Sequence, residues 1–253
     1  MTMLTLNPGR LTALGRSELT LLVRNRAALT LAVLMPLLMV FVLRSSLSGA
    51  EGAEALGEAT VTGGIGLVLI LVVHMNLVSA YVARREELVL KRLRTGEATD
   101  LEIIAGTALP AAALAFGQIT VLTVAGAAAL DVRMPRNPLL LVVAVLAGIV
   151  LLAGMSALIS SFTRTVETAG LTTLPLFLAT VLGSGLFVPA DSLPGVAASL
   201  CELLPLSGVM TLVRAGWSGA GDADLVGAAL VTLAWTVNTV FAVRRWFRWE
   251  PRR

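Results

Sequence analysis

The chain has 253 residues, of which 57% are hydrophobic and only 14% are charged, and its formal net charge is +3. Soluble domains carry about 45–50% apolar and about 25% charged residues, so this composition excludes a water-soluble globular protein. The surplus apolar surface has to face lipid. The single cysteine, Cys201, excludes a disulfide within the chain.

Residues 1–26 precede the first long apolar stretch and combine leucines with arginines at helical spacing. On a helical wheel the leucines cluster on one face and the arginines lie opposite, at Leu11, Leu14, Leu21 and Leu22 against Arg10, Arg16 and Arg24. This pattern predicts an amphipathic helix at the cytoplasmic membrane surface. The alternative is a solvated basic tail.

Six apolar windows follow, each close to the roughly 20 residues that a membrane-spanning helix needs. They cover residues 27–43, 61–83, 103–130, 139–160, 171–188 and 224–243. Open strands cannot satisfy their backbone groups in lipid, so helices are expected. The sequence therefore predicts an all-α integral membrane domain of six transmembrane helices over residues 27–253.

The connections between these windows carry further predictions. The segment 84–102 is the most charged of the chain, and its leucines alternate with basic residues. It is expected to form a short cytoplasmic helix, with simple headgroup anchoring as the alternative. Two short helices, at 196–204 and 206–217, are expected between the fifth and sixth windows, either on the outer leaflet or dipping into it. A basic tail, 244–253, ends the chain.

The distribution of basic residues predicts the orientation. A cytoplasmic N-terminus places all but four of the 19 Lys and Arg residues inside, the exceptions being Arg44, Arg133, Arg136 and Arg214. Because cytoplasmic loops carry an excess of Lys and Arg, we expect a multi-pass protein with both termini in the cytoplasm.

Motifs for catalysis are missing from the sequence. A P-loop needs a Gly-Lys pair before Ser or Thr to hold phosphates, whereas the sole lysine, Lys91, follows Leu90. The chain is therefore not expected to hydrolyse ATP itself, nor to be an enzyme of another class. One His and one Cys, far apart in sequence, also give no basis for a metal site.

Four polar residues lie inside the apolar windows, namely His74, Asn76, Gln118 and Asn238. Polar groups in lipid mark either a transport pathway or hydrogen bonds between helices. His74 has no Asp or Glu within any window that could continue a proton relay. Both interpretations stay open for all four.

Two segments resemble those of a known family. Residues 85–95, Arg-Glu-Glu-Leu-Val-Leu-Lys-Arg-Leu-Arg-Thr, resemble the Arg-Glu-x-Gly-x-Leu-Lys-Arg-Leu-Arg-x-Thr-Pro segment of ABC-2 type exporter permeases, close to the daunorubicin-resistance branch. Leu88 stands where Gly is usual, and no proline follows Thr95. Residues 188–194, Val-Pro-Ala-Asp-Ser-Leu-Pro, with Leu-Pro-Leu at 204–206 and Arg214, are similar to the family's second segment.

This resemblance implies the transmembrane subunit of an ATP-driven exporter in a bacterial cell membrane. Two copies, expected as a homodimer, would work with separate ATP-binding subunits that hold ATP and Mg²⁺, while this chain binds no cofactor and no nucleic acid. The implied substrate is an amphipathic drug or antibiotic, as in multidrug efflux; lipid or polysaccharide export and a self-contained secondary transporter are the alternatives. The resemblance also implies coupling to the ATPase by Glu86, Glu87, Leu90, Lys91, Arg92, Leu93 and Arg94.

Overall fold

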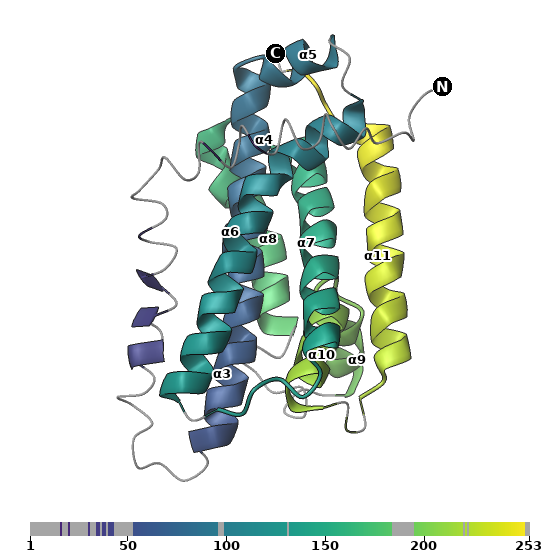
Figure 1. Ribbon diagram of the computed structural model, residues 1–253. Helices are drawn as coiled ribbons and strands as arrows, with labels where there is room; N and C mark the ends of the chain where they lie inside the picture. The colour runs from purple at the N-terminus through teal and green to yellow at the C-terminus, as the bar shows by residue number, and fades with distance from the viewer. Residues whose placement is uncertain are drawn as a thin grey trace.

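The computed structural model describes residues 53–95, 99–130, 132–183, 195–219, 221 and 223–250, together with isolated positions before residue 43 (Figure 1). Every regular element in this part of the chain is helical, which confirms the all-α prediction for it. The predicted amphipathic helix at 1–26, most of the first predicted span, 27–43, and the segment 188–194 lie outside the described residues.

The first described element is a long helical rod made of three consecutive helices. These are α3 (Ala53–Val68), the π-helical segment η1 (Leu69–Met75) and α4 (Asn76–Glu86). Of this rod, the stretch Ala55–Glu86 is a candidate membrane span of 32 residues. At 1.5 Å per residue it is about 48 Å long, more than the roughly 30 Å of the hydrocarbon core. The rod contains the predicted span 61–83 and extends beyond the hydrocarbon core.

Three further helices are long and apolar enough to cross a membrane: α6 (Asp100–Ala129), α7 (Pro138–Ser160) and α11 (Leu225–Trp246). Side chains just before two of them fix where they begin. At the start of α7, Asn137 accepts a hydrogen bond from the Leu140 N–H, and Pro138 occupies the first turn. At the start of α11, Asp224 accepts a hydrogen bond from the Gly227 N–H. Such caps satisfy backbone donors that the first turn leaves unpaired.

The predicted span 171–188 corresponds to α8 (Val166–Gly183), which begins five residues earlier. By length and composition, four candidate spans are identified in the described residues: the rod, α6, α7 and α11. They agree with the predicted windows 61–83, 103–130, 139–160 and 224–243. The total of six spans stays a prediction.

Helix α7 lies at the centre of the bundle and contacts the rod, α6, α8, α10 and α11. Gly148, halfway along it, permits a close approach of its neighbours. A Cβ atom there would lie 2.9 Å from Cγ1 of Val209 and 3.1 Å from Cδ1 of Leu69. The absence of a side chain thus lets α7, α10 and η1 meet at one level, within the continuous core of buried Leu, Val, Ile and Ala residues.

The two short helices expected before the last span are present as α9 (Gly195–Glu202) and α10 (Ser207–Ser218). Helix α10 runs along the first half of α7. Its start contacts Gly148, and near its end the Gly216 carbonyl accepts a 2.9 Å hydrogen bond from the Asn137 N–H. The indole of Trp235, midway along α11, donates to the Leu203 carbonyl in the connection between α9 and α10. This connection therefore lies at the level of the middle of the spans.

Candidate functional site

The predicted coupling segment lies at one end of the bundle, at the top of Figure 1, where α4 turns into α5 (Val89–Arg94). The turn depends on Leu88, whose φ of 59° and ψ of 15° are left-handed. Glycine adopts this conformation without strain, whereas a Cβ atom makes it unfavourable. Leu88 thus has the backbone conformation that favours Gly, the residue that the family resembled by this segment usually carries here.

Helix α5 has one buried anchor and several exposed charges. Leu90 is completely buried within the chain. The other predicted coupling residues are half-buried at Leu93 and exposed at Glu86, Glu87, Lys91, Arg92 and Arg94. The structure thus brings all seven together on a short stretch. Leu90 holds α5 against the bundle and is not available to a partner, whereas the charged residues are.

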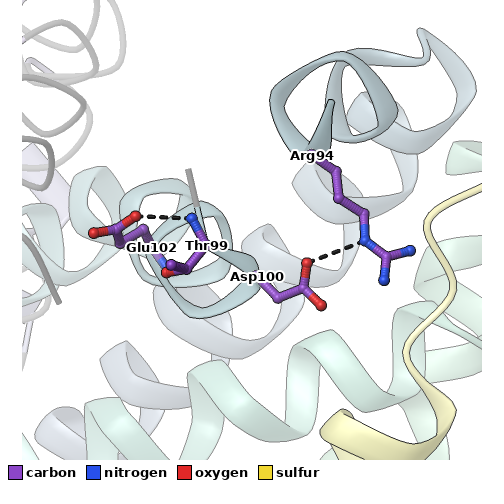
Figure 2. A network of polar contacts seen from close by, with 4 residues as sticks. All are labelled: Arg94, Thr99, Asp100 and Glu102. Atoms are coloured by element: carbon purple, nitrogen blue, oxygen red, sulfur yellow. Dashed lines mark hydrogen bonds and ion pairs between the residues drawn. The ribbon is translucent and has the colours of Figure 1, made fainter. Parts of the chain in front are cut away.

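Polar contacts fix the connection from α5 to α6 (Figure 2). The Thr99 hydroxyl accepts a 3.3 Å hydrogen bond from the Glu102 N–H, and the Glu102 carboxylate accepts a 2.8 Å bond from the Thr99 N–H. This reciprocal capping box satisfies two donors at the start of α6. Arg94 adds a 3.1 Å ion pair to Asp100, so the end of α5 is tied to the start of the next span.

Arg85, at the end of α4, ties the rod to the central helix. Its side chain is only 1% exposed. Its guanidinium donates to the carbonyls of Ser160 at 2.7 Å and Thr163 at 2.5 Å, with a longer contact to Arg164 at 3.5 Å. Ser160 is the last residue of α7, and Thr163 and Arg164 follow it; a cation at this end also complements the helix dipole. Arg85 therefore closes the end of α7 and holds α5 in place through α4.

The segment that follows α11 also contacts α5. After α11, the segment 247–250 crosses toward α5, in yellow in Figure 1. Glu250 forms a 2.8 Å ion pair with Lys91, and the Arg94 guanidinium lies 4.8 Å from the centroid of the Trp249 ring. Phe247 packs edge-on against Trp249 and also contacts Tyr81 of α4, with ring centroids 4.8 and 6.1 Å apart respectively.

An open cavity of about 610 Å³ lies between this segment and α5, lined by Lys91, Arg94, Thr95, Arg248, Trp249 and Glu250. Within the predicted basic tail 244–253, residues 248–250 thus pack beside α5. Sequence reasoning missed the contacts of Trp249 and Glu250 because no local pattern links them to residue 91. It also missed the role of Arg85, for which the only signal was its place at the start of the resembling segment.

The four polar residues of the spans do not form one site. His74, in η1, is buried, and its Nδ1 lies 2.9 Å from the Ser156 hydroxyl of α7. Gln118 is buried in α6, whereas Asn76 and Asn238 are exposed on the surface of the bundle. No hydrogen bond joins any two of the four. His74 thus takes part in a contact between η1 and α7. A role of the four residues in a transport pathway stays a prediction.

The described residues contain no group of three or more His, Cys, Asp or Glu side chains able to hold a metal ion. This end of the bundle instead presents exposed acidic and basic side chains on and beside the short, firmly anchored helix α5. Such a surface is suited to binding another macromolecule.

Comparisons with known proteins give the family context. The chain is 26% identical over 196 residues to the linearmycin resistance permease protein LnrN of Bacillus subtilis (strain 168). That alignment covers 76% of this chain and 50% of the relative, so the chain spans about half the length of the curated relative that it matches. The family model described as ABC-2 type transporter matches residues 10–217, which is most of the sequence, and the chain therefore belongs to the ABC-2 type transporter family.

Proposed function

We propose that this chain is the membrane-spanning permease subunit of an ATP-driven exporter and that α5 receives the movement of a separate ATP-binding subunit. The observation that carries the proposal is the construction of α5. The charged residues Glu87, in the turn before α5, and Arg92, on α5, are exposed, while Leu90 and Arg85 anchor this segment to the bundle. A firmly held helix can transmit a displacement to the spans on either side of it, here α4 and α6.

The proposed orientation places α5 in the cytoplasm, where ATP is available. Basic residues gather at this end of the bundle, which the positive-inside rule assigns to the cytoplasm. Those in the described residues at or near this end are Arg84, Arg85, Lys91, Arg92, Arg94, Arg164, Arg244, Arg245 and Arg248. In the same orientation α9 and α10 enter the membrane from the outside and return. Two contacts at mid-span support this placement: that of α10 with Gly148 of α7, and the hydrogen bond from Trp235 of α11 to Leu203 in the connection between α9 and α10.

We further propose that two copies form the pathway. Asn76 and Asn238 lie within apolar helices, yet both are exposed on the single chain. A polar side chain facing lipid is costly, and such residues normally face a protein interior or a water-filled cavity. A second copy of the chain would supply either environment.

Docking can be tested by co-purifying the chain with P-loop ATPases from its own organism. Reversing an exposed charge, as Glu87→Lys or Arg92→Glu, should lower its co-purification and coupled ATP hydrolysis at least about tenfold, because opposed like charges destabilise an interface by more than about 1.4 kcal/mol. Arg245→Glu is the matched control, since Arg245 is exposed at the same end but lies outside the segment 86–94. Unchanged coupling in both Glu87→Lys and Arg92→Glu would refute the docking role.

The substrate class is proposed to be an amphipathic drug or antibiotic. A relative is named for linearmycin resistance, so linearmycin is the first compound to test. Cells that produce this chain with the ATPase should accumulate less of it and tolerate more than cells with either protein alone. Equal accumulation for linearmycin and a panel of amphipathic drugs would contradict drug export and favour a lipid or polysaccharide substrate.

A further inference from the structure

We propose that the cavity between α5 and the segment 247–250 receives a carboxylate side chain of the ATP-binding subunit, which takes the place of Glu250 on Lys91. This inference rests on the proposed function and adds a second element, the C-terminal segment, to the docking surface. The two sides of the cavity are far apart in the sequence. Residues 91–95 follow the first described span, and residues 248–250 follow the last one.

The charge of the cavity favours an anionic ligand. Three cationic side chains line it, Lys91, Arg94 and Arg248, against one carboxylate, Glu250. Arg94 already pairs with Asp100, while Arg248 is exposed and forms no ion pair with any described residue. A positive concave surface attracts the opposite charge more strongly than a flat one does. The volume of about 610 Å³ can hold an acidic side chain together with water.

The wall of the cavity is firmly held, whereas the ion pair across it can exchange. Trp249 is fixed between the Arg94 guanidinium and the Phe247 ring. By contrast, the side chains of Lys91 and Glu250 are 53% and 65% exposed. Exposed ion pairs contribute little to stability. An incoming carboxylate can therefore replace Glu250 on Lys91 and gain the additional attraction of Arg248.

The geometry favours a protein carboxylate over a lipid phosphate. The stretch Ala55–Glu86 of the rod, which leads to α5, is about 48 Å long, compared with about 40–45 Å for a bilayer including its headgroups. With the rod centred in the membrane, its end at Glu86 already lies at the outer limit of the headgroups, and the cavity on α5 lies beyond it. There it faces the space that a cytoplasmic subunit occupies.

The test measures the affinity of a P-loop ATPase from the same organism for the full chain in nanodiscs of phosphatidylcholine. Lys91→Gln and Arg248→Gln should each weaken binding about twofold to fivefold, the range of one exposed ion pair. Glu250→Gln should strengthen binding by a similar factor, because it removes the competing carboxylate. Arg245→Gln, which removes one charge from the same end but outside the cavity, should leave binding unchanged.

Each contrary result identifies what has failed. If the unchanged chain does not bind the ATPase, the proposed function is wrong. If it binds but Glu250→Gln has no effect or weakens binding, the exchange is wrong. Equal weakening by Arg245→Gln and Arg248→Gln would show a diffuse charge effect and overturn the cavity. Effects of the cavity variants that are seen only in phosphatidylglycerol nanodiscs would assign the cavity to lipid instead.

Discussion

Removing the side chain of Arg85 should be the most destabilising single change at the α5 end of the bundle. In Arg85→Met the length is nearly kept, but both short hydrogen bonds to the carbonyls of Ser160 and Thr163 are lost. A buried acceptor left without its partner costs about 1–3 kcal/mol. The Thr163 carbonyl is such an acceptor, whereas the Ser160 carbonyl keeps a 3.2 Å hydrogen bond from the Thr163 N–H. Together with the lost bond to Ser160 and the lost attraction to the α7 dipole, this gives a loss of about 3 kcal/mol of unfolding free energy.

The assay is thermal unfolding of the purified chain in detergent, followed by the fluorescence of its four tryptophans. For a chain of this size, 1 kcal/mol shifts Tm by about 2–4 °C, so the expected fall for Arg85→Met is about 6–12 °C. Arg85→Lys keeps the charge but not the fork of donors and should fall in between.

Arg92→Met is the matched control for loss of a positive charge. Arg92 is exposed on α5, so its replacement should change Tm by less than about 2 °C, as surface substitutions usually do. Equal Tm values for Arg85→Met and Arg92→Met would refute the role of Arg85 as the tie between α4 and α7.

Three further predictions use the same measurement. Leu88→Gly should raise Tm by about 1–4 °C, because relief of about 1–2 kcal/mol of left-handed strain exceeds the entropy that Gly loses on folding; a lower Tm would contradict the strain. Thr99→Ala should lower Tm by about 2–4 °C, since it removes the hydroxyl that caps α6, and an unchanged Tm would show that the cap contributes nothing. Gly216→Ala should destabilise by about 1–3 kcal/mol, because its Cβ would lie 2.8 Å from the backbone nitrogen of Leu141. Gly170→Ala, with open space around its Cβ, is the control and should not destabilise.

The spans were predictable because lipid imposes a simple rule on composition and length. The windows 103–130 and 139–160 differ from α6 and α7 by at most three residues at any end. The starts of these helices also carried local signals, in the capping box of Thr99 and in Asn137 followed by Pro138. Such signals act within a few residues, so sequence alone is sufficient to find them.

Contacts between distant segments were not predictable in this way. Nothing local relates Glu250 to Lys91, or Arg85 to the carbonyls at the end of α7, because these pairs form only when the helices pack. The exposed positions of Asn76 and Asn238 were likewise undetermined, since composition places a residue in a span but not on a face of the bundle. Within α5, only the packed structure distinguishes Leu90, which faces inward, from its charged neighbours.

The π-helical segment Leu69–Met75 has a consequence for aligning this chain with relatives. A π-helical turn accommodates one residue more than an α-helical turn, so it absorbs an insertion that would otherwise rotate the rest of the rod by about 100°. Loss of one residue within 69–75 can therefore leave the faces of both α3 and α4 in register, whereas the same loss within α4 would turn Arg85 away from α7. We expect length variation in this span to be concentrated beside His74.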